Sequence, residues 1–513
     1  MKKYLYLALF MLTCPLWAVP IRIITTADMH GYLLPRLERG HYYGGAAELL
    51  EYWKRNEGYR PEKFLTICCG DTSTAGPAIS YLLRGAPTMD AMNRIGYDVC
   101  ALGNHEFDLT VNGLKDWQQQ AKFPFISANL EMKGKPWDGV PPYVILEQDG
   151  IKVGIIGLTT LDVEERSDRP GAVSMVDTLR KYVPEMRAQG AQMIIVAAHE
   201  GILEMFKVAK EVPELRIPLW LAGHSHEMGS LAVFGERTGY IVASGDWFDS
   251  YARIDMDIDP KTGAAELLSC KQVTIRSDKP MPADKALAAR IAYWKERTMK
   301  AELMPVPTVT IPWLAKAPVI DGKVDADWGT AAILDTFWVP AGNGKRAEPP
   351  TQVLLGVDGK NLYLAARCTL IPGVEPTAKS TARDTDQWQD DSIELFVWPD
   401  ERNGRFVQFI VNAAGSLLDT ENLFDPGSRM TSDAKWNPAY TAKTGREGNA
   451  WTLEMAIPLE VAGLTAKPGA AFRLNLNRNI IEKEQRYASW SPLPVTSFHV
   501  PPYFGKAVIA PKP

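Results

Sequence analysis

Metal-binding and acid–base side chains recur in this chain directly after short apolar runs. Histidine is scarce, with seven in 513 residues, yet five of the seven fall at such positions, together with two aspartates and an asparagine. The set comprises Asp28, His30, Asp71, Asn104, His105, His199, His224 and His226. If these side chains were packing residues in a core, they would leave many buried polar atoms to satisfy. The set therefore favours a functional site over a structural explanation.

The donor atoms of this set are nitrogen and oxygen, with no thiolate. Such ligands suit two divalent ions such as Zn, Mn or Fe and do not decide among them. Asp28 and His30 point to the same face of an extended segment, so both can hold one ion. Two ions about 3.5–4 Å apart can stabilise the attacking and the leaving oxygen of a phosphoryl transfer. One carboxylate usually bridges such a pair, and a water between the ions becomes the nucleophile.

The apolar runs before these side chains predict strands that alternate with helices. Strands are expected at 21–26, 64–69, 98–102, 151–158, 193–198 and 218–222, with closing strands at 240–243 and 251–258. Helices are expected at 46–53 and 79–95. Strands that alternate with helices and deliver a polar group at each end describe an α/β domain, with a site along one edge of the sheet.

The second half of the chain has a different texture. A helical pattern over 282–303 ends at Pro305 and predicts a connecting helix. Beyond it, short alternating runs are separated by Gly, Asp, Asn and Pro, which predicts an antiparallel β-sandwich. These runs lie at 353–357, 362–366, 392–398, 406–411, 451–457 and 472–476. The predicted boundaries are a signal peptide at 1–18, an α/β domain at 19–278, a connecting helix at 279–305 and a β-sandwich at 306–513.

Length, charge and the N-terminus narrow the class of protein. A chain of 513 residues is too long for a single core, and a formal net charge of −5 implies no basic surface for nucleic acid. Met1-Lys2-Lys3 and the apolar run 4–16 are typical of a signal peptide cleaved near Ala18, which predicts export to the periplasm or the medium. An uncleaved anchor or lipidation at Cys14 is the alternative. No other apolar run is long enough to span a bilayer.

The motifs around the first set of residues resemble those of the calcineurin-like metallophosphoesterases. They are Asp28-Met29-His30, Gly70-Asp71, Gly103-Asn104-His105-Glu106, His199 and Gly223-His224-Ser225-His226, in this order. Gly44-Gly45 and Asn104-His105-Glu106-Phe107-Asp108 are most similar to the 5′-nucleotidase branch. The resemblance covers roughly residues 20–275 and implies a four-layer α/β/β/α domain with two metal ions.

The resemblance also implies a role for each site residue. Asp28, His30, Asp71 and His226 would hold one metal, and Asp71, Asn104, His199 and His224 the other, with Asp71 bridging. His105 would contact the phosphate and stabilise charge or protonate the leaving oxygen. Asp108 would orient His105; the alternative for Asp108 is a loop-capping carboxylate. Glu106 is expected to be structural.

The second half resembles a family 9 carbohydrate-binding module. The similarity rests on the segments 320–328, 390–396, 412–415 and 451–458. Such modules stack sugars on aromatic faces, which makes Trp388, Trp436 and Trp490 candidates, with burial in the core as the alternative for each. The base-binding second domain that 5′-nucleotidases carry has no counterpart in this sequence.

Together these observations predict an exported, dinuclear-metal phosphoesterase that hydrolyses monoesters of the 5′-nucleotide or nucleotide-sugar type, in nucleotide catabolism. A cyclic-nucleotide phosphodiesterase and a phosphatase of a phosphorylated sugar or glycan are the enzymatic alternatives. A non-catalytic carbohydrate-binding protein is the alternative class, and the complete ligand set argues against it. The expected partners are a small-molecule phosphate ester and a carbohydrate at the C-terminal domain. No nucleic acid polymer is expected as a partner, and no membrane span is expected in the mature chain.

Overall fold

The computed structural model of this chain describes residues 18–166, 169–233, 239–300, 304–342, 344–428, 430–481 and 485–512. The expected signal peptide therefore lies outside the described residues, apart from Ala18. The chain divides into two compact units. The first unit runs to Gly76 and continues over Arg84–Ile291, and the second comprises Pro77–Leu83 and the chain from Ala292 onward. Within the described ranges, no helix combines the length and apolarity needed to cross a bilayer.

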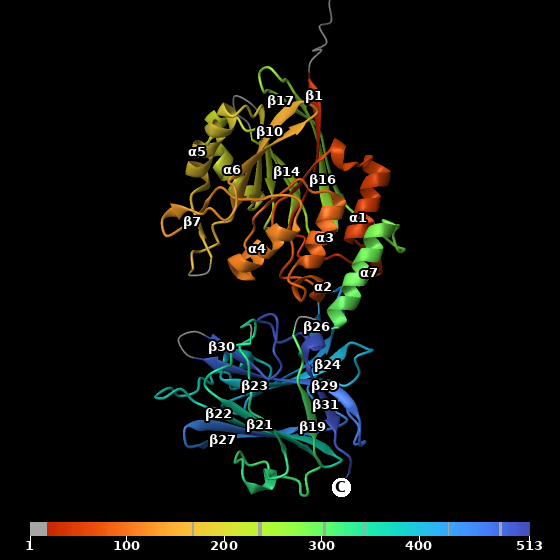
Figure 1. The fold of residues 1–513 in the computed structure, drawn as a ribbon, viewed down its shortest axis with the longest axis vertical. Coiled ribbons are helices and arrows are strands. Elements are labelled where there is room, and N and C mark those ends of the chain that lie inside the picture. The colour runs from red at the N-terminus through yellow and green to blue at the C-terminus, as the bar shows by residue number, and fades with distance from the viewer. Residues whose placement is uncertain are drawn as a thin grey trace, which may run out of the picture. The chain divides into compact units, whose positions relative to one another are not determined.

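Two six-stranded sheets form the centre of the first unit (Figure 1). The first sheet has the order β17 (Ala265–Thr274), β16 (Ser250–Ile258), β1 (Val19–Thr26), β4 (Leu65–Cys68), β5 (Val99–Ala101) and β6 (Phe125–Ile126). The second has the order β14 (Met228–Val233), β15 (Gly239–Ser244), β13 (Leu219–Ala222), β12 (Met193–His199), β10 (Ile151–Thr159) and β9 (Tyr143–Gln148).

Strand periodicity explains how the second sheet is buried on both faces. Ile155 and Ile195 belong to the apolar cluster that they share with Ile23 and Ile67 of the first sheet. Their chain neighbours point the other way, because successive side chains of a strand alternate between faces. Ile156, for example, belongs to a second cluster with residues of the helices α5 (Met175–Ala188) and α6 (Ile202–Glu211).

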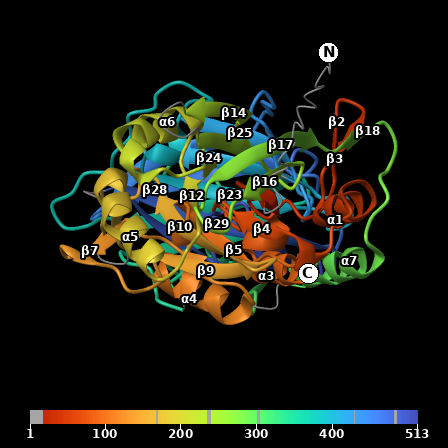
Figure 2. The same ribbon diagram turned by 90° about the horizontal axis from the view of Figure 1, so that it is seen from above.

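The helices of the first unit complete its layers. Figure 2 shows α5 and α6 on one side of the strands and α1 (Ala46–Tyr52) and α3 (Ala86–Ile95) on the other. The order helix, sheet, sheet, helix confirms the predicted four-layer α/β fold. The remaining elements are α4 (Thr110–Gln120) and two small sheets, β18 (Arg276–Ser277), β3 (His41–Tyr43) and β2 (Arg36–Glu38), and β11 (Gly171–Ala172), β7 (Leu130–Met132) and β8 (Lys135–Pro136).

Within each sheet, parallel pairing brings the carboxyl ends of neighbouring strands together. β1 pairs in parallel with β4 and β4 with β5, while β10, β12 and β13 pair in parallel in the other sheet. The carboxyl ends of parallel neighbours lie together, which is where open α/β sheets present their ligand sites. The segments after β1, β4, β5, β12 and β13 carry the predicted site residues.

One predicted helix, over 79–95, is wrong as a continuous element. The structure has α2 (Ala78–Tyr81) and then α3, separated by a turn. Gly85 takes φ +79°, in the left-handed region that favours glycine, and a Cβ there would lie 2.4 Å from Nε1 of Trp117. This turn breaks the helix, and α2 belongs to the second unit. The helix predicted over 282–303 is observed as α7 (Lys285–Met299), and residues 301–303 are outside the described ranges.

The second unit is a β-sandwich, as predicted. One sheet has the path β19 (Thr308–Ile311), β31 (Gly505–Ile509), β29 (Ala471–Ile481), β23 (Ser392–Trp398), β24 (Arg405–Asn412), β25 (Leu417–Leu423) and β26 (Thr431–Asp433), with β30 (Gln485–Ser489) also on β29. The other has the order β20 (Ala332–Leu334), β21 (Thr351–Val357), β22 (Asn361–Thr369), β28 (Ala450–Pro458) and β27 (Thr441–Glu447). Inward residues such as Leu355, Leu395 and Leu453 form one apolar core.

The segment Pro77–Leu83 packs inside this second unit. Ala78 and Leu82 are buried in an apolar cluster with Phe396, Trp398 and other aromatic side chains. The backbone N–H of Ile79 donates to the carbonyl oxygen of Pro426 at 2.7 Å. Seven residues that lie early in the chain thus complete a domain formed almost entirely by its C-terminal half.

Candidate metal centre

The loops at the strand ends hold several site residues in an unusual backbone conformation. Positive φ values occur at Asp28 (50°), His30 (45°), Asp71 (55°), His224 (70°) and His226 (55°). A residue other than glycine in this left-handed region of backbone conformation carries a strain energy of about 1–3 kcal/mol, and such residues cluster at functional sites. Close packing accompanies this strain, since a Cβ at Gly103 would lie 2.2 Å from Oδ1 of Asp71. The fold therefore forces these side chains together.

Asp28, His30 and His226 form one candidate ligand group. One ligand atom from each lies within 4.8 Å of the others. The Nε2 atoms of His30 and His226 are 3.2 Å apart, and Nε2 of His226 is 3.7 Å from Oδ1 of Asp28. Asp28 also accepts the backbone N–H of His224 at 2.9 Å, which connects this group to the second one.

Asp71, His199 and His224 form the other candidate ligand group, again with ligand atoms within 4.8 Å of one another. Nε2 of His199 lies 3.1 Å from Oδ2 of Asp71 and 3.1 Å from Oδ1 of Asn104. The amide oxygen of Asn104 is thus positioned to be a further ligand. The donor set is nitrogen and oxygen throughout, which fits a divalent ion of the Zn, Mn or Fe type.

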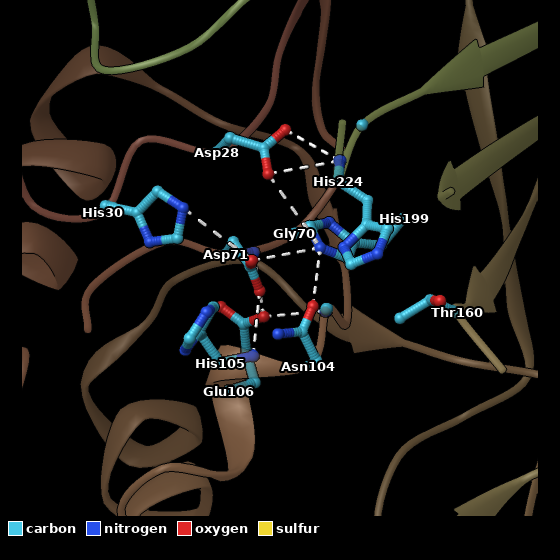
Figure 3. A network of polar contacts seen from close by, with 12 residues as sticks. Asp28, His30, Gly70, Asp71, Asn104, His105, Glu106, Thr160, His199 and His224 are labelled. Carbon is cyan, nitrogen blue, oxygen red and sulfur yellow. Dashed lines mark hydrogen bonds and ion pairs between the residues drawn. The ribbon is translucent and has the colours of Figure 1, made fainter. Parts of the chain in front are cut away.

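Asp71 lies between the two groups. Its Oδ2 is 3.8 Å from Nε2 of His30 in the first group and 3.1 Å from Nε2 of His199 in the second. Figure 3 shows Asp71 at the centre, with His30 on one side and His199 and His224 on the other. The structure therefore brings all seven predicted metal ligands into one cluster and places one carboxylate where it can bridge two ions.

The second ring nitrogen fixes the orientation of several imidazoles. Nδ1 of His30 lies 2.7 Å from the carbonyl oxygen of Thr74, and Nδ1 of His199 lies 2.7 Å from that of Cys69. In the neutral ring, a proton that Nδ1 donates to such a carbonyl leaves Nε2 without a proton and able to bind a metal. Both backbone acceptors belong to the loop around Asp71, so one loop orients ligands of both groups.

Sequence reasoning missed two carboxylates that contact the more exposed histidines. Oδ2 of Asp246 lies 2.8 Å from Nδ1 of His226, and Oδ2 of Asp162 lies 3.2 Å from Nε2 of His224. Asp246 follows strand β15 by two residues, and Asp162 follows β10 by three. Their position after a predicted strand is the signal in the sequence, although this position alone does not distinguish them from surface aspartates.

Glu106 connects the two loops that carry Asp71 and Asn104. Its fully buried carboxylate accepts the backbone N–H groups of Asp71 at 2.9 Å, Thr72 at 2.8 Å and Gly103 at 2.7 Å. It also accepts the Thr72 hydroxyl at 2.9 Å. Four donors on one carboxylate are a strong constraint on loop geometry, in line with the structural role expected for this residue.

His105 and Asp108 form a pair at the border of the cluster. Nδ1 of His105 lies 2.8 Å from Oδ2 of Asp108, and the backbone N–H of His105 donates to Oδ1 of Asp71 at 2.9 Å. The hydrogen bond that Nδ1 of His105 donates to the Asp108 carboxylate raises the pKa of His105 to about 9. Near neutral pH the ring is therefore a cation and a proton donor, while its side chain remains one-third exposed.

Burial and neighbouring charges shift the pKa values of the clustered residues in different directions. Burial raises the pKa of Asp28 to about 7 and lowers that of His30 to about 4. Burial also opposes the ionised form of Asp71, but His199 and His30 outweigh it and hold its pKa below the usual range. Burial opposes charge on His199 in the same way, yet Asp71 raises its pKa to about 10. A metal ion bound here would displace the proton of His199.

The second unit contains a separate cavity of about 500 Å³. Its lining includes Trp388, which is 45% exposed, with Glu394, Gln408, Asn479 and His499. Glu394 accepts Nδ2 of Asn479 at 2.6 Å and Nε2 of Gln408 at 2.8 Å. The cavity thus combines an aromatic face with a fixed set of polar groups, a combination suited to a small polar ligand.

Only one of the three predicted sugar-stacking tryptophans lines this cavity. Trp490 is 6% exposed and belongs to the apolar core, and Trp436 is partly buried against Phe409. Their place in the core agrees with the alternative weighed for each of them. Of the three tryptophans, Trp388 is the one that lines the cavity.

The comparisons with protein families agree with both halves of this description. Residues 21–228 match the family described as calcineurin-like phosphoesterase. Residues 320–511 match the family described as carbohydrate family 9 binding domain-like. The chain thus carries one domain of each kind, and the resemblances predicted from its motifs are confirmed.

Individual relatives match part of the chain. Protein UshA of Yersinia enterocolitica is 26% identical over 350 residues, which are 59% of this chain and 62% of that protein. The 2′,3′-cyclic-nucleotide 2′-phosphodiesterase/3′-nucleotidase of Haemophilus influenzae is 25% identical over 316 residues, 53% of this chain and 47% of that protein. The crystal structure of a 5′-nucleotidase precursor from Thermus thermophilus has a TM-score of 0.48 at 24% identity, covering 57% of this chain and 62% of that one. The chain spans less than two thirds of each of these proteins.

Proposed function

We propose that this chain, through its calcineurin-like phosphoesterase domain, is a metal-dependent hydrolase of phosphate monoesters of the 5′-nucleotide or nucleotide-sugar type. The observation that carries the proposal is the position of Asp71, whose Oδ2 lies within 3.8 Å of a histidine in each ligand group. A shared carboxylate between two nitrogen- and oxygen-rich groups is the arrangement that dinuclear phosphoesterases require. Metal binding by these residues and their division into two sites are parts of the proposal.

The bound ions would activate water as a nucleophile and neutralise charge on the phosphate. Around them, the protein supplies fixed ligands, because Thr74, Cys69 and Asp246 orient three of the imidazoles. Asp28 is fully buried, and bound cations would stabilise its ionised form. This donor set suits Zn, Mn and Fe alike, so the metal has to be identified by metal-loading experiments.

His105 is the proposed contact to the phosphate group. Its ring is charged near neutral pH, partly exposed and oriented by Asp108. A cationic donor at this position can stabilise charge that develops on the phosphoryl oxygens, or protonate the leaving oxygen. The neighbouring Asn104 joins this dyad to the metal groups through its 3.1 Å contact with His199.

The experiment is a phosphate-release screen on the mature full chain with added Mn²⁺ or Zn²⁺. The panel holds nucleoside 5′-monophosphates, nucleotide-sugars, cyclic nucleotides and sugar phosphates. The variant His105→Ala should lower kcat by about 10²–10⁴-fold if the ring acts as a general acid. His41→Ala is the matched control, because His41 also bonds an aspartate, Asp278, but lies outside the ligand groups. Absence of hydrolysis with every metal, although metal is bound, would overturn the proposal.

A cyclic-nucleotide phosphodiesterase is the second candidate activity. The name of the Haemophilus influenzae relative supports it, since that protein is a 2′,3′-cyclic-nucleotide 2′-phosphodiesterase/3′-nucleotidase. The same substrate panel separates the two candidates by the preferred substrate. A preference for sugar phosphates would instead support the phosphatase alternative, in which the second unit retains a glycan.

We further propose that the second unit binds carbohydrate in its 500 Å³ cavity. The exposed ring of Trp388 would stack on the sugar, while Glu394 and Asn479 would bond its hydroxyl groups. Glycan-array binding of the full chain tests this, with Trp388→Ala as the variant. Leu423→Ala is the control. Leu423 is an exposed apolar residue of β25, in the sheet that carries Glu394, and it lies outside the cavity lining. Equal binding by both variants would overturn this proposal.

Export is also part of the proposed function. The N-terminal charged and apolar segments support a signal peptide at residues 1–18, and an extracytoplasmic location suits an enzyme that acts on external nucleotides. Cell fractionation with N-terminal sequencing of the mature protein tests it. An intact Met1 in the purified native protein would contradict cleavage near Ala18.

A further inference from the structure

Trp247 lies beside the first ligand group at the centre of an aromatic cluster. Its ring centroid is 6.0 Å from that of His226, at an interplanar angle of 75°. Tyr32 lies 5.0 Å away with a tilt of 30°, and Cζ of Arg36 lies 4.4 Å over the indole. The half-buried Trp247 thus connects a proposed metal ligand, His226, to Tyr32 and Arg36.

Arg36 and Tyr32 cover the same face of the indole. Cζ of Arg36 is 5.7 Å from the centroid of Tyr32, and both groups lie 4.4–5.0 Å from the centre of Trp247. Groups on opposite faces would be separated by nearly the sum of those two distances. The opposite face of Trp247 is therefore not covered by either group, and the residue retains partial exposure.

Arg36 acts here by packing rather than as a binder of phosphate. One terminal nitrogen bonds Asp249 and the other bonds Glu38 at 3.0 Å. With both terminal nitrogens paired to carboxylates, the charge of the guanidinium is balanced and the group is held over the ring. A planar cation stacked on an indole also fixes the position of that indole.

The backbone at Trp247 is bent to place the ring at the metal group. Trp247 and Phe248 both have φ +55°, which two consecutive side-chain-bearing residues rarely adopt. The backbone N–H of Trp247 donates to the carbonyl oxygen of Asp28 at 3.0 Å, and Phe248 is fully buried. Observed strain of this kind motivates a functional hypothesis for the residue that it positions.

We propose that the face of Trp247 opposite Arg36 and Tyr32 is a stacking wall for a flat ring in the group that is esterified to the phosphate. This inference rests on the proposed function, because it assigns a subsite next to the same metal centre. Nucleobases and the faces of sugar rings both stack on indole, so the shared chemistry is a ring with a flat face. Trp247 is therefore a specificity-determining residue that favours ring-bearing phosphate esters over open-chain ones.

The test compares three substrates on the metal-loaded full chain: adenosine 5′-monophosphate, glucose 1-phosphate and glycerol 3-phosphate. Trp247→Leu should raise KM for adenosine monophosphate about tenfold to hundredfold and change that for glycerol 3-phosphate by less than about twofold. Trp247→Phe should retain part of the preference. A matching loss with glucose 1-phosphate extends the wall to sugar rings, and loss with adenosine monophosphate alone restricts it to bases. Both outcomes support the proposal.

The matched control is Trp294→Leu, which removes another tryptophan that carries an arginine over its ring, Arg297 at 5.6 Å. Equal losses on all three substrates, or loss of bound metal in Trp247→Leu, would overturn the proposal and assign Trp247 to metal-site geometry. No loss on any substrate would also overturn it. If the wild type hydrolyses none of the three, the proposed function fails. Calorimetric binding of adenosine monophosphate and glycerol 3-phosphate to both proteins then still decides whether Trp247 discriminates.

Discussion

Oδ2 of Asp246 lies 2.8 Å from Nδ1 of His226, across the ring from the Nε2 atom that faces Asp28 and His30. The carboxylate raises the pKa of His226 and fixes the ring while leaving Nε2 directed at the first ligand group. Carboxylate–histidine–metal arrangements of this type hold the ligand orientation and increase its basicity. Asp246 is therefore placed to position His226 as a ligand of one of the two proposed metal ions.

Replacing this carboxylate should weaken metal binding without unfolding the protein. We expect Asp246→Asn to lower the affinity for one of two metal equivalents by about 10–100-fold. Competitive chelator titration with elemental analysis measures both equivalents. Asp278→Asn is the control, since Asp278 makes the same kind of bond to His41 outside the ligand groups. Unchanged affinity for both ions in Asp246→Asn would contradict the assigned role.

Glu106→Gln should destabilise the first unit although the two side chains have the same shape. The carboxylate accepts the backbone N–H groups of Asp71, Thr72 and Gly103, and an amide nitrogen in place of one oxygen cannot accept them. Each buried donor left without an acceptor costs about 1–3 kcal/mol. Urea denaturation measures the free energy of unfolding, with the exposed Glu147→Gln as the control. Equal stability of the two variants would show that the loops do not depend on Glu106.

The stability of the second unit should fall as the pH rises through the weakly acidic range. Burial raises the pKa of Glu394 from 4.5 to about 7, so the folded state binds this proton more tightly than the unfolded chain does. A raised pKa gives stability that is complete below pH 4.5 and is lost as the pH passes 7. The total loss is on the order of 3 kcal/mol.

Denaturation at pH 5 and pH 8 measures this loss in wild type and in Glu394→Gln, which cannot ionise. The difference between the two pH values should shrink in Glu394→Gln and stay unchanged in Glu460→Gln, where the glutamate is exposed. The same pH dependence in wild type and Glu394→Gln would assign the effect to other groups.

Removing metal should lower the melting temperature. Asp28 and Asp71 are buried carboxylates at 0% and 2% exposure, and a bound cation stabilises the folded state through its binding free energy. At a free metal concentration one hundred times Kd, the gain is about 2.7 kcal/mol per site. Thermal unfolding with Mn²⁺ and with excess chelator measures the gain. Asp71→Asn should lose most of it, and a gain equal to that of wild type would show that Asp71 does not bind the ions.

The strands and the ligand cluster could be predicted from the sequence because the same local signal produces both. An apolar run such as Ile21–Thr26 must be buried, and the polar residue after it marks the point where the strand leaves the sheet. Parallel pairing then brings Asp28 and Asp71 together at one end of the first sheet, and His199 and His224 together at one end of the second. The two pairs meet in one cluster because the sheets pack on each other through a shared apolar core.

The supporting residues could not be predicted in the same way. Asp162 and Asp246 act on histidines that are 62 and 20 residues away in the chain, and their sequence context alone does not distinguish them from surface aspartates. The break at Gly85 depends on the ring of Trp117, which a helical pattern does not reveal. Trp247 owes its position to a left-handed backbone that its residue type disfavours.

The segment Pro77–Leu83 has a consequence for how such a protein can be taken apart or recombined. It begins six residues after Asp71, yet Ala78 and Leu82 fill the apolar cluster around Phe396 and Trp398 in the other unit. A gene fragment that starts at residue 306 encodes the sandwich without this filling and leaves those rings uncovered. Exchange of the C-terminal half for another module would have to replace two separated stretches of DNA together. We therefore expect the two domains to be inherited together and not to be exchanged separately between genes.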